Sequence, residues 1–240
     1  MTNIVTFGSC LSRYIARSYK RLFAGNITNS VYHNRSDYFV NSFIKKNNNV
    51  VNQSLMNVLQ SKNTIDINDD ASLILLNQTI EGLGQHKIEN SHELMDNLQS
   101  LKIDILIIDN FMDISARLSS GLGFNFFARP NDYKNYEENF SLGGFITTSE
   151  SIENFNTIIK YFKSIQPTMK IVFVHFPYNT YGEDSNRKDR SLSFYKEFNN
   201  DSIIMIPPLS IPKIYRTEVA SHFQEPQYTA YAGMINILIK

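Results

Sequence analysis

The sequence predicts an α/β fold of three layers, in which helices cover both faces of a mostly parallel central sheet. Short apolar runs alternate with amphipathic stretches along the chain, which is the pattern of strands followed by helices. Two of these runs end at a glycine or a proline, where a strand stops. With 240 residues, 42% of them hydrophobic, the chain is long enough to bury a large core, so we expect one domain over residues 1–240.

The N-terminal part of the chain predicts a strand, a tight turn and a helix. Residues 3–7 form an apolar run that ends at Gly8. Residues 11–23 carry apolar side chains at helical spacing, with basic side chains largely on the other face, and Gly25 ends this helix. The segments that follow are a strand over residues 27–33, a helix over residues 50–59, and residues 72–76, which receive no assignment.

The rest of the chain repeats the alternation. Residues 103–108 predict the clearest buried strand, because five of these six residues are apolar. Residues 149–163 predict a helix with large apolar side chains on one face. The other expected elements are a helix over 91–100, strands over 170–176 and 202–206, a polar loop over 178–190 with a helix after it to Phe198, and a terminal helix over 227–239.

A long segment without a regular pattern, residues 119–144, interrupts this alternation. It contains several glycines, Pro130 and aromatic residues that include Phe124, Phe126, Phe127 and Tyr133. Such a segment is unusual in a compact domain unless it is functional or disordered, and its aromatic residues indicate order. Two interpretations stay open: a lid or substrate-binding insertion, in which Arg129 and the aromatic side chains would contact a sugar, or a packed connecting loop.

Composition excludes several classes of protein. Lys plus Arg and Asp plus Glu number 23 each, so the net charge is zero, which argues against nucleic-acid binding and fits a neutral substrate such as a sugar. The single cysteine, Cys10, has no disulfide partner, and no histidine pair has metal-ligand spacing, so we expect no metal. Neither a signal peptide nor a run of about 18 apolar residues is visible, so we predict a cytoplasmic protein without a membrane span.

Two candidate nucleophiles lie in the first turn, where a ligand would bind beyond the end of a parallel strand. Ser9 follows a glycine at a helix N-terminus, so its hydroxyl would point outward and the first helix amides would stabilise an oxyanion. The alternative is that Ser9 is a helix N-cap, a position that serine favours. Cys10 is the competing nucleophile, since a helix N-terminus favours a thiolate, and its alternative is a small buried core residue.

Candidate partners for the nucleophile follow the other predicted strands. His222, just before the terminal helix, is the candidate base, and His175, after the fourth strand, is its rival; either would otherwise be structural. Asn110 follows the clearest strand, and its amide would donate to an oxyanion or cap a helix. Arg35 and Ser36 follow the second strand and would bind substrate or form a second wall of the oxyanion hole; a surface ion pair is the alternative for Arg35.

The order of these motifs resembles the SGNH (GDSL-like) hydrolase superfamily, and more closely bacterial SGNH-like proteins that open with a Gly-Ser-Cys turn and are associated with surface polysaccharide synthesis. The matching pieces are residues 7–13, 34–36, 104–109 and 222–223, followed by Tyr228 and Tyr231. The resemblance implies a three-layer α/β/α fold with Ser9 as nucleophile and His222 as base. It also implies an oxyanion hole formed by the Ser9 amide, a backbone amide near Arg35 or Ser36, and Asn110.

The sequence departs from the pattern of this superfamily at three places. The usual Gly-Asp-Ser opening is Gly-Ser-Cys here, and only Asn110 fits the usual Gly-x-Asn-Asp block. The acid expected three residues before the histidine is Val219, with Glu218 one residue away. Glu218 or Asp109 is therefore the possible orienting group, and a dyad remains chemically reasonable because the third group mainly orients the base.

Three functions follow from these residues. The first is a serine-dependent ester hydrolase or O-acetyltransferase that acts on a carbohydrate, in surface polysaccharide biosynthesis, with no cofactor except an acyl donor such as acetyl-CoA in the transferase case. The second is a non-catalytic protein on the same fold that binds a carbohydrate or another ligand. The third is an enzyme that depends on Cys10. The sequence leaves the substrate and the oligomeric state open.

Overall fold

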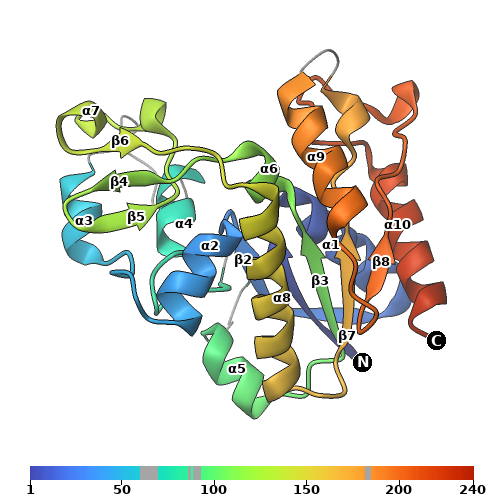
Figure 1. Ribbon diagram of the computed structural model, residues 1–240. Helices are drawn as coiled ribbons and strands as arrows, with labels where there is room; N and C mark the ends of the chain where they lie inside the picture. Colours follow the sequence, from blue (N-terminus) through green and yellow to red (C-terminus); the bar gives the residue numbers. More distant parts are fainter. Residues whose placement is uncertain (60–69, 86–87, 89–92, 182–184) are drawn as a thin grey trace.

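Five parallel strands form a central sheet in the computed structural model of the protein (Figure 1). The structure describes residues 1–59, 70–85, 88, 93–181 and 185–240. The strands are, in their order across the sheet, β2 (Gly25–Tyr32), β1 (Thr2–Gly8), β3 (Ile105–Asp109), β7 (Lys170–Val174) and β8 (Ile204–Ile206). All neighbouring pairs in this sheet are parallel, which confirms the predicted sheet.

Helices cover both faces of this sheet. One face packs against α1 (Cys10–Phe23) and α10 (Glu225–Leu238), and the core there contains Ile4 of β1. The other core contains Val5, since successive strand residues point to opposite faces. The helices on that side are α2 (Ser36–Phe39), α5 (Leu94–Ser100), α8 (Thr148–Ile165) and α9 (Ser185–Glu197). The predicted three-layer α/β/α architecture is therefore confirmed.

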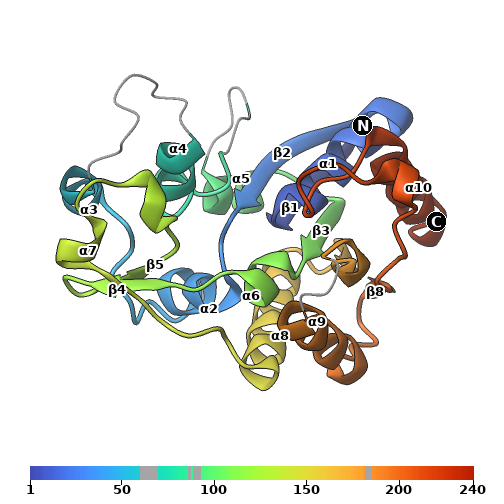
Figure 2. The ribbon, with the colours of Figure 1, turned by 90° about the horizontal axis from the view of Figure 1, so that it is seen from above.

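A smaller lobe lies to one side of the central sheet in both Figure 1 and Figure 2. Its antiparallel sheet has the order β5 (Phe124–Phe126), β4 (Ser119–Gly121), β6 (Ser141–Leu142). The helices α3 (Gln53–Val58), α4 (Asp70–Leu76) and α7 (Tyr136–Asn139) accompany it. Leu55 and Leu75 pack there against Phe126 and Tyr133. Residues 119–144 are thus folded into strands and short helices around a core that they share with α3 and α4.

Several predicted boundaries differ from the observed ones. The unassigned residues 72–76 belong to α4, whose seven residues, about two turns, are too few to show a period. The helix α9 starts at Ser185, inside the predicted polar loop. The prediction was wrong there because the first residues of this helix are mostly polar and resemble a loop. The predicted start of α5 at residue 91 lies outside the described residues. The remaining short elements are a π-helix (Val40–Ile44), α6 (Phe111–Ser115), and 3-10 turns at Pro130–Asp132, Tyr178–Thr180 and Lys213–Tyr215.

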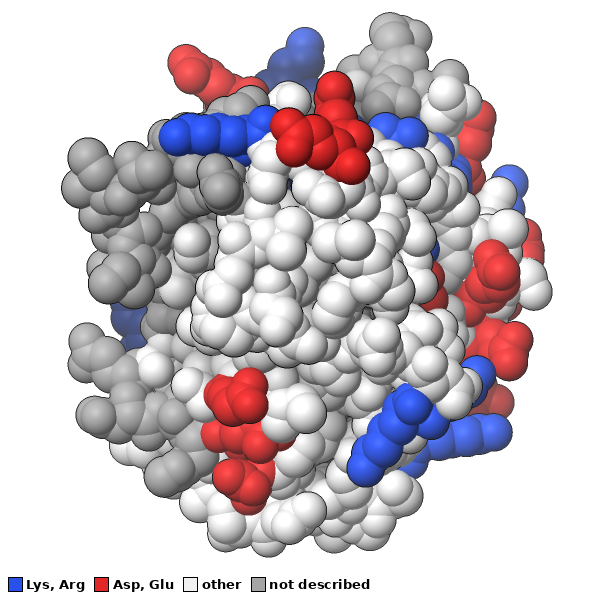
Figure 3. Space-filling view, turned by 90° about the vertical axis from the view of Figure 1, so that its left-hand side faces the viewer, with Lys and Arg blue, Asp and Glu red and all other residues white. Residues whose placement is uncertain are grey.

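The surface over the smaller lobe carries few charged side chains. Figure 3 shows small separate groups of acidic and basic residues around a broad area without either.

Among the described residues, no helix is both long enough and apolar enough to cross a membrane.

The turn after β1 lies beside the end of β2, because the two strands are paired up to their last residues. Gly8 pairs with Tyr32 in the parallel register, and the amide of His33 donates to the Gly8 carbonyl at 2.8 Å. The end of β3 is adjacent, since β1 also pairs with β3. Side chains that follow these strands therefore lie at one edge of the sheet.

Candidate active site

Three side chains meet at this edge. The Cys10 sulfur lies 3.2 Å from Nε2 of His222 and 2.9 Å from the hydroxyl of Tyr32. Cys10 is the first residue of α1, Tyr32 is the last residue of β2, and His222 lies in the loop before α10. Both ends of the chain therefore build this cluster, which we call the Cys10 site.

The backbone of the turn after β1 determines which side chain faces the cluster. Gly8 has a φ of +136°, a conformation that L side chains rarely adopt. Ser9 is extended and caps α1, with its hydroxyl oxygen accepting a hydrogen bond from the Leu11 amide at 3.1 Å. Because Ser9 takes the cap position, Cys10 begins the helix and its sulfur faces Tyr32 and His222.

A buried carboxylate, Asp109 at the end of β3, holds this turn. Its Oδ2 accepts from the amides of Ser9 at 2.8 Å and Ser12 at 3.0 Å. Its Oδ1 accepts from the Ser9 hydroxyl at 2.9 Å and from the Phe111 amide at 3.0 Å. A Cβ atom at Gly8 would lie 2.6 Å from Oδ2, so glycine leaves the space that the carboxylate occupies. Four donors surround Asp109, and its function is to fix the turn.

The predicted nucleophile Ser9 is not paired with the predicted base. Its hydroxyl donates to Asp109, and within the described part of the chain the His222 ring hydrogen-bonds Cys10 instead. The N-cap interpretation of Ser9 is confirmed. A nucleophilic role for Ser9 stays a prediction, whereas the geometry favours the competing candidate, Cys10.

His222 connects the Cys10 site to an open groove of about 920 Å³. The groove runs between α1 and the chain that leads into α10, and its lining includes Tyr14, Arg17, Arg21, Thr217, Glu218, Glu225 and Tyr228. The ring of Tyr14 lies edge-on to the His222 imidazole, with centroids 5.9 Å apart. A ligand in this groove would reach the base first and the sulfur behind it.

The structure provides no carboxylate to orient His222. Among the described residues, no Asp or Glu hydrogen-bonds its ring, which corrects the expectation for Glu218 and Asp109. Asp109 is committed to the turn after β1. Glu218 is exposed on the wall of the groove. Cys10 and His222 therefore form a dyad, with Tyr32 as the third group in contact with the sulfur.

The resting state of this dyad is uncharged at neutral pH. Burial raises the pKa of the Cys10 thiol, which is 9% exposed; the Tyr32 hydrogen bond and the Arg13 guanidinium partly offset this effect. Burial lowers the pKa of His222. The imidazole is thus free to accept a proton, and the thiol would lose its proton to His222 during attack on a substrate.

Two of the three predicted oxyanion donors are already in use. The Ser9 amide donates to Asp109, and the Ser36 amide donates to Oδ1 of Asp113 at 2.9 Å. This corrects the expectation for both amides, because each satisfies a buried carboxylate. Asn110 differs: its Oδ1 accepts from the Phe176 amide at 2.9 Å, while its buried Nδ2 has no partner among the described residues. Asn110 therefore offers an oriented donor that is free.

The predicted substrate-binding arginines lie elsewhere. Arg35 forms two hydrogen bonds with Asp37, at 2.7 and 2.6 Å, and donates to the carbonyls of Ala116 and Gly144, so it joins loops instead of facing the groove. Arg129 pairs with Asp132 at 2.7 Å and lines a separate cavity of about 390 Å³. These contacts correct the expectation that Arg35 binds substrate, and Arg129 is not among the residues that line the groove.

His175, the rival base, lies in an aromatic part of the core. Its ring packs against Phe173 and Tyr195, with centroids 5.1 and 5.0 Å away. Burial lowers its pKa to about 4, and no described residue hydrogen-bonds either ring nitrogen. The structural interpretation of His175 therefore fits this position.

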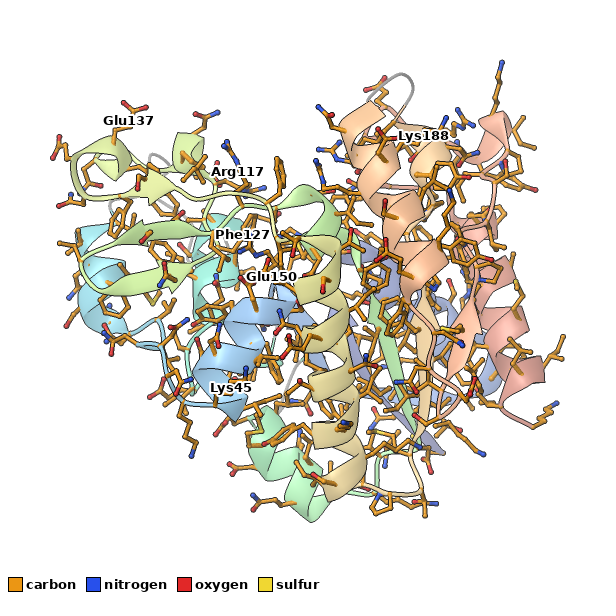
Figure 4. All side chains as sticks on the ribbon, viewed as in Figure 1. Lys45, Arg117, Phe127, Glu137, Glu150 and Lys188 are labelled. Atoms are coloured by element: carbon orange, nitrogen blue, oxygen red, sulfur yellow. The ribbon has the colours of Figure 1, made fainter. Side chains whose placement is uncertain are left out.

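The smaller lobe reaches the Cys10 site through Phe127. Figure 4 shows Phe127 at the junction between that lobe and the central sheet. Its ring lies 5.8 Å from that of His33, and it packs against the small cluster that contains Cys10 and Tyr32. One residue of the 119–144 segment thus forms part of the wall behind the sulfur, and a lid function for the whole segment stays a prediction.

Sequence reasoning missed Tyr32. The candidates after the second strand were Arg35 and Ser36, whereas the side chain that contacts the sulfur is the last residue of the strand itself. An aromatic residue at the end of a predicted strand is typical of a core, so the residue type did not indicate a functional role. The useful signal was its position at the carboxyl end, where a parallel sheet gathers functional side chains.

Comparisons with known proteins identify no family: no family model matches the chain, and no curated protein matches its sequence. Similar solved structures include a lipase from a goat rumen metagenome, with 8% identity and a TM-score of 0.48, covering 99% of this chain and 97% of that one. A carbohydrate esterase family 3 protein from Talaromyces cellulolyticus has 8% identity and a TM-score of 0.48, covering 100% and 98%. An acetyl xylan esterase from the rumen bacterium Butyrivibrio proteoclasticus has 7% identity and a TM-score of 0.49, covering 99% and 63%.

Proposed function

We propose that the protein is an acyl-transfer enzyme in which Cys10 is the nucleophile and His222 is the general base. The observation that carries this proposal is the 3.2 Å separation between the Cys10 sulfur and Nε2 of His222. This distance allows a direct proton transfer, and His222 lines an open groove. The position of the sulfur at the N-terminus of α1 adds the favourable end of the helix dipole for a thiolate.

The reaction proceeds in two half-reactions. In the first, Nε2 of His222 takes the thiol proton while the sulfur attacks the carbonyl carbon of an ester. The tetrahedral intermediate collapses, the alcohol leaves with the proton from His222, and a thioester remains on Cys10. In the second, His222 takes a proton from the acceptor, the acceptor oxygen attacks the thioester, and the sulfur leaves and recovers its proton.

Asn110 is the residue to which we assign the oxyanion. Its Nδ2 is buried without a partner in the part of the chain that the structure describes, and the hydrogen bond from Phe176 to its Oδ1 fixes the orientation of the amide. Buried donors without a partner are uncommon, so a developing negative charge is a fitting acceptor.

The substrate class that we propose is an acylated carbohydrate. Tyr14 and Tyr228 give the groove aromatic surfaces, and charged groups of both signs line its walls, which suits a hydroxyl-rich ring. Water as acceptor gives an esterase. A sugar hydroxyl as acceptor, with acetyl-CoA or another acyl donor, gives an O-acetyltransferase of surface polysaccharide biosynthesis.

The test compares variants of the two adjacent candidate nucleophiles. We expect Cys10→Ala and His222→Ala each to lower turnover of 4-nitrophenyl acetate and of acetylated sugars by about a thousandfold or more. We expect Ser9→Ala to retain most of the activity. Mass spectrometry of the trapped acyl-enzyme should place the acyl group on Cys10. An acyl group on Ser9, or full activity in Cys10→Ala, would show that the assignment is wrong.

The second candidate is a binding protein on the same fold. The specific observation in its favour is that no described carboxylate orients His222. In that case the wild-type protein would bind acetylated sugars in calorimetry, show no turnover of any ester, and form no acyl-enzyme.

A further inference from the structure

Tyr32 is a buried side chain whose hydroxyl contacts the proposed nucleophile. It is 4% exposed, and its hydroxyl oxygen lies 2.9 Å from the Cys10 sulfur. Tyr32 is on β2, whereas the two members of the dyad are on α1 and in the loop before α10. A tyrosine that only filled the core would not place its hydroxyl on a sulfur that also contacts a histidine nitrogen.

The count of protons at the sulfur determines the direction of this hydrogen bond. A thiol has one hydrogen, and His222 can act as a base only if that hydrogen points toward its Nε2. The hydrogen between Cys10 and Tyr32 must then come from the tyrosine, so the phenol donates and the sulfur accepts. After the proton has moved to His222, the same phenol donates to a thiolate, and hydrogen bonds to charged groups are the stronger ones.

The Tyr32 ring is held in place by its surroundings. The His33 imidazole stacks on it, with centroids 3.9 Å apart and planes 18° apart, and the Arg13 guanidinium lies 5.7 Å from its centre. The Tyr32 amide donates to Oδ1 of Asn77 at 2.7 Å. His33 has a φ of +54°, a left-handed conformation that is uncommon for residues other than glycine and that turns the chain directly after Tyr32.

We propose that Tyr32 is a third catalytic residue, which donates a hydrogen bond to the Cys10 sulfur and stabilises its thiolate form in both half-reactions. This inference rests on the proposed function. In acylation, the phenol stabilises the charge on sulfur as His222 removes the proton. In deacylation, it donates to the sulfur as the carbon–sulfur bond breaks and the electron pair returns to sulfur. Tyr32 keeps its own proton throughout, so no further acid or base is required.

The decisive variant is Tyr32→Phe, which removes the hydroxyl and keeps the ring. The matched control is Tyr38→Phe, since Tyr38 is also buried and its hydroxyl hydrogen-bonds the Gln78 carbonyl and the Val51 amide, outside the Cys10 site. Cys10 is the only cysteine of the chain, so iodoacetamide alkylation reports on this sulfur alone. Thermal unfolding checks that both variants are folded.

We expect the pH profile of alkylation to move upward by about one to two pH units in Tyr32→Phe and to stay in place in Tyr38→Phe. We expect kcat/KM of the Tyr32 variant to fall by about tenfold or more. An unchanged alkylation profile with unchanged kcat/KM would overturn the role of Tyr32. Turnover retained in Cys10→Ala would instead overturn the proposed function, so the two failures are distinguishable.

Discussion

The turn after β1 and the turn after β2 use the same anchor with opposite results. In each, a serine donates its amide and its hydroxyl to one buried aspartate: Ser9 to Asp109, and Ser36 to Asp113. The residue next to Ser9 is Cys10, whose sulfur faces a histidine on an open groove. The residue next to Ser36 is Arg35, which forms an ion pair and loop contacts. The serine–aspartate anchor is therefore structural, and the neighbour determines whether the turn is reactive.

The largest effect is expected from Asp109→Ala, which removes the anchor of the reactive turn. Three backbone amides and a hydroxyl would lose their acceptor in a buried place, so we expect a loss of at least about 3 kcal/mol of unfolding free energy and of nearly all turnover. Urea unfolding and kcat/KM measure the two effects. Wild-type kinetics in this variant would show that the turn presents Cys10 without the carboxylate.

The second-largest effect concerns the Ser36–Asp113 anchor, whose contribution to stability depends on pH. Burial raises the pKa of Asp113 from 3.8 to about 6, so the folded protein holds this proton over a range where the unfolded chain has lost it. Its contribution to stability is thus greatest below pH 3.8 and falls as pH rises toward 6.

The variant Asp113→Asn remains uncharged at every pH and should remove that dependence. We expect the stability difference between wild type and variant to change by about 2 to 3 kcal/mol between pH 3.5 and pH 7, in urea unfolding, with the wild type losing stability relative to the variant as pH rises. Cys10 alkylation should be unaffected in folded Asp113→Asn. A difference that stays constant with pH would contradict the raised pKa.

A smaller effect is expected from Ser9→Ala, with Ser36→Ala as the matched variant at the second turn. The loss of the α1 cap should lower the unfolding free energy by about 1 kcal/mol, and activity should fall less than tenfold. Ser36→Ala should cost a similar stability and leave activity in place. If Ser9→Ala is inactive while Cys10→Ala is active, the nucleophile of the first turn is Ser9 and not its neighbour Cys10.

The smallest effect is a displacement of the pH–activity profile. Burial lowers the pKa of His222 below its ordinary 6.5, so the base becomes protonated only at more acidic pH. We expect the acid limb of kcat/KM to have its midpoint below pH 6.5. Burial lowers the pKa of His33, the histidine of the second turn, to about 3, so the limb should persist in Asp113→Asn. A midpoint above 6.5 would indicate that a carboxylate faces His222 in solution.

Much of the fold was predictable because its long elements are strongly periodic. The helix α8 and the strand β3 follow from residues 149–163 and 103–108, where side-chain spacing and apolar content leave one interpretation. The smaller sheet was not predictable, since its strands have two or three residues and no period develops over that length. Its core depends on contacts with residues in the ranges 51–59 and 71–75, which are distant in sequence.

The site was predictable in place and not in detail. His222 and the first turn were identified because polar residues gather at the carboxyl ends of parallel strands. The choice between Ser9 and Cys10 depends on which one caps the helix, and adjacent side chains in such a turn point in different directions. Sequence alone does not give that backbone geometry. Tyr32 was missed because its contact with Cys10 appears only when β2 is placed beside β1.

The close approach of Gly8 and Asp109 has a consequence for the history of the protein. These residues are about a hundred positions apart, yet a Cβ atom at position 8 would lie 2.6 Å from the Asp109 carboxylate and 2.7 Å from its backbone carbonyl oxygen. The φ of +136° at Gly8 is also one that L side chains rarely adopt, so a shorter residue at position 109 would not make room for a side chain at position 8. Related chains should therefore keep this glycine, even where the residue at the nucleophile position differs.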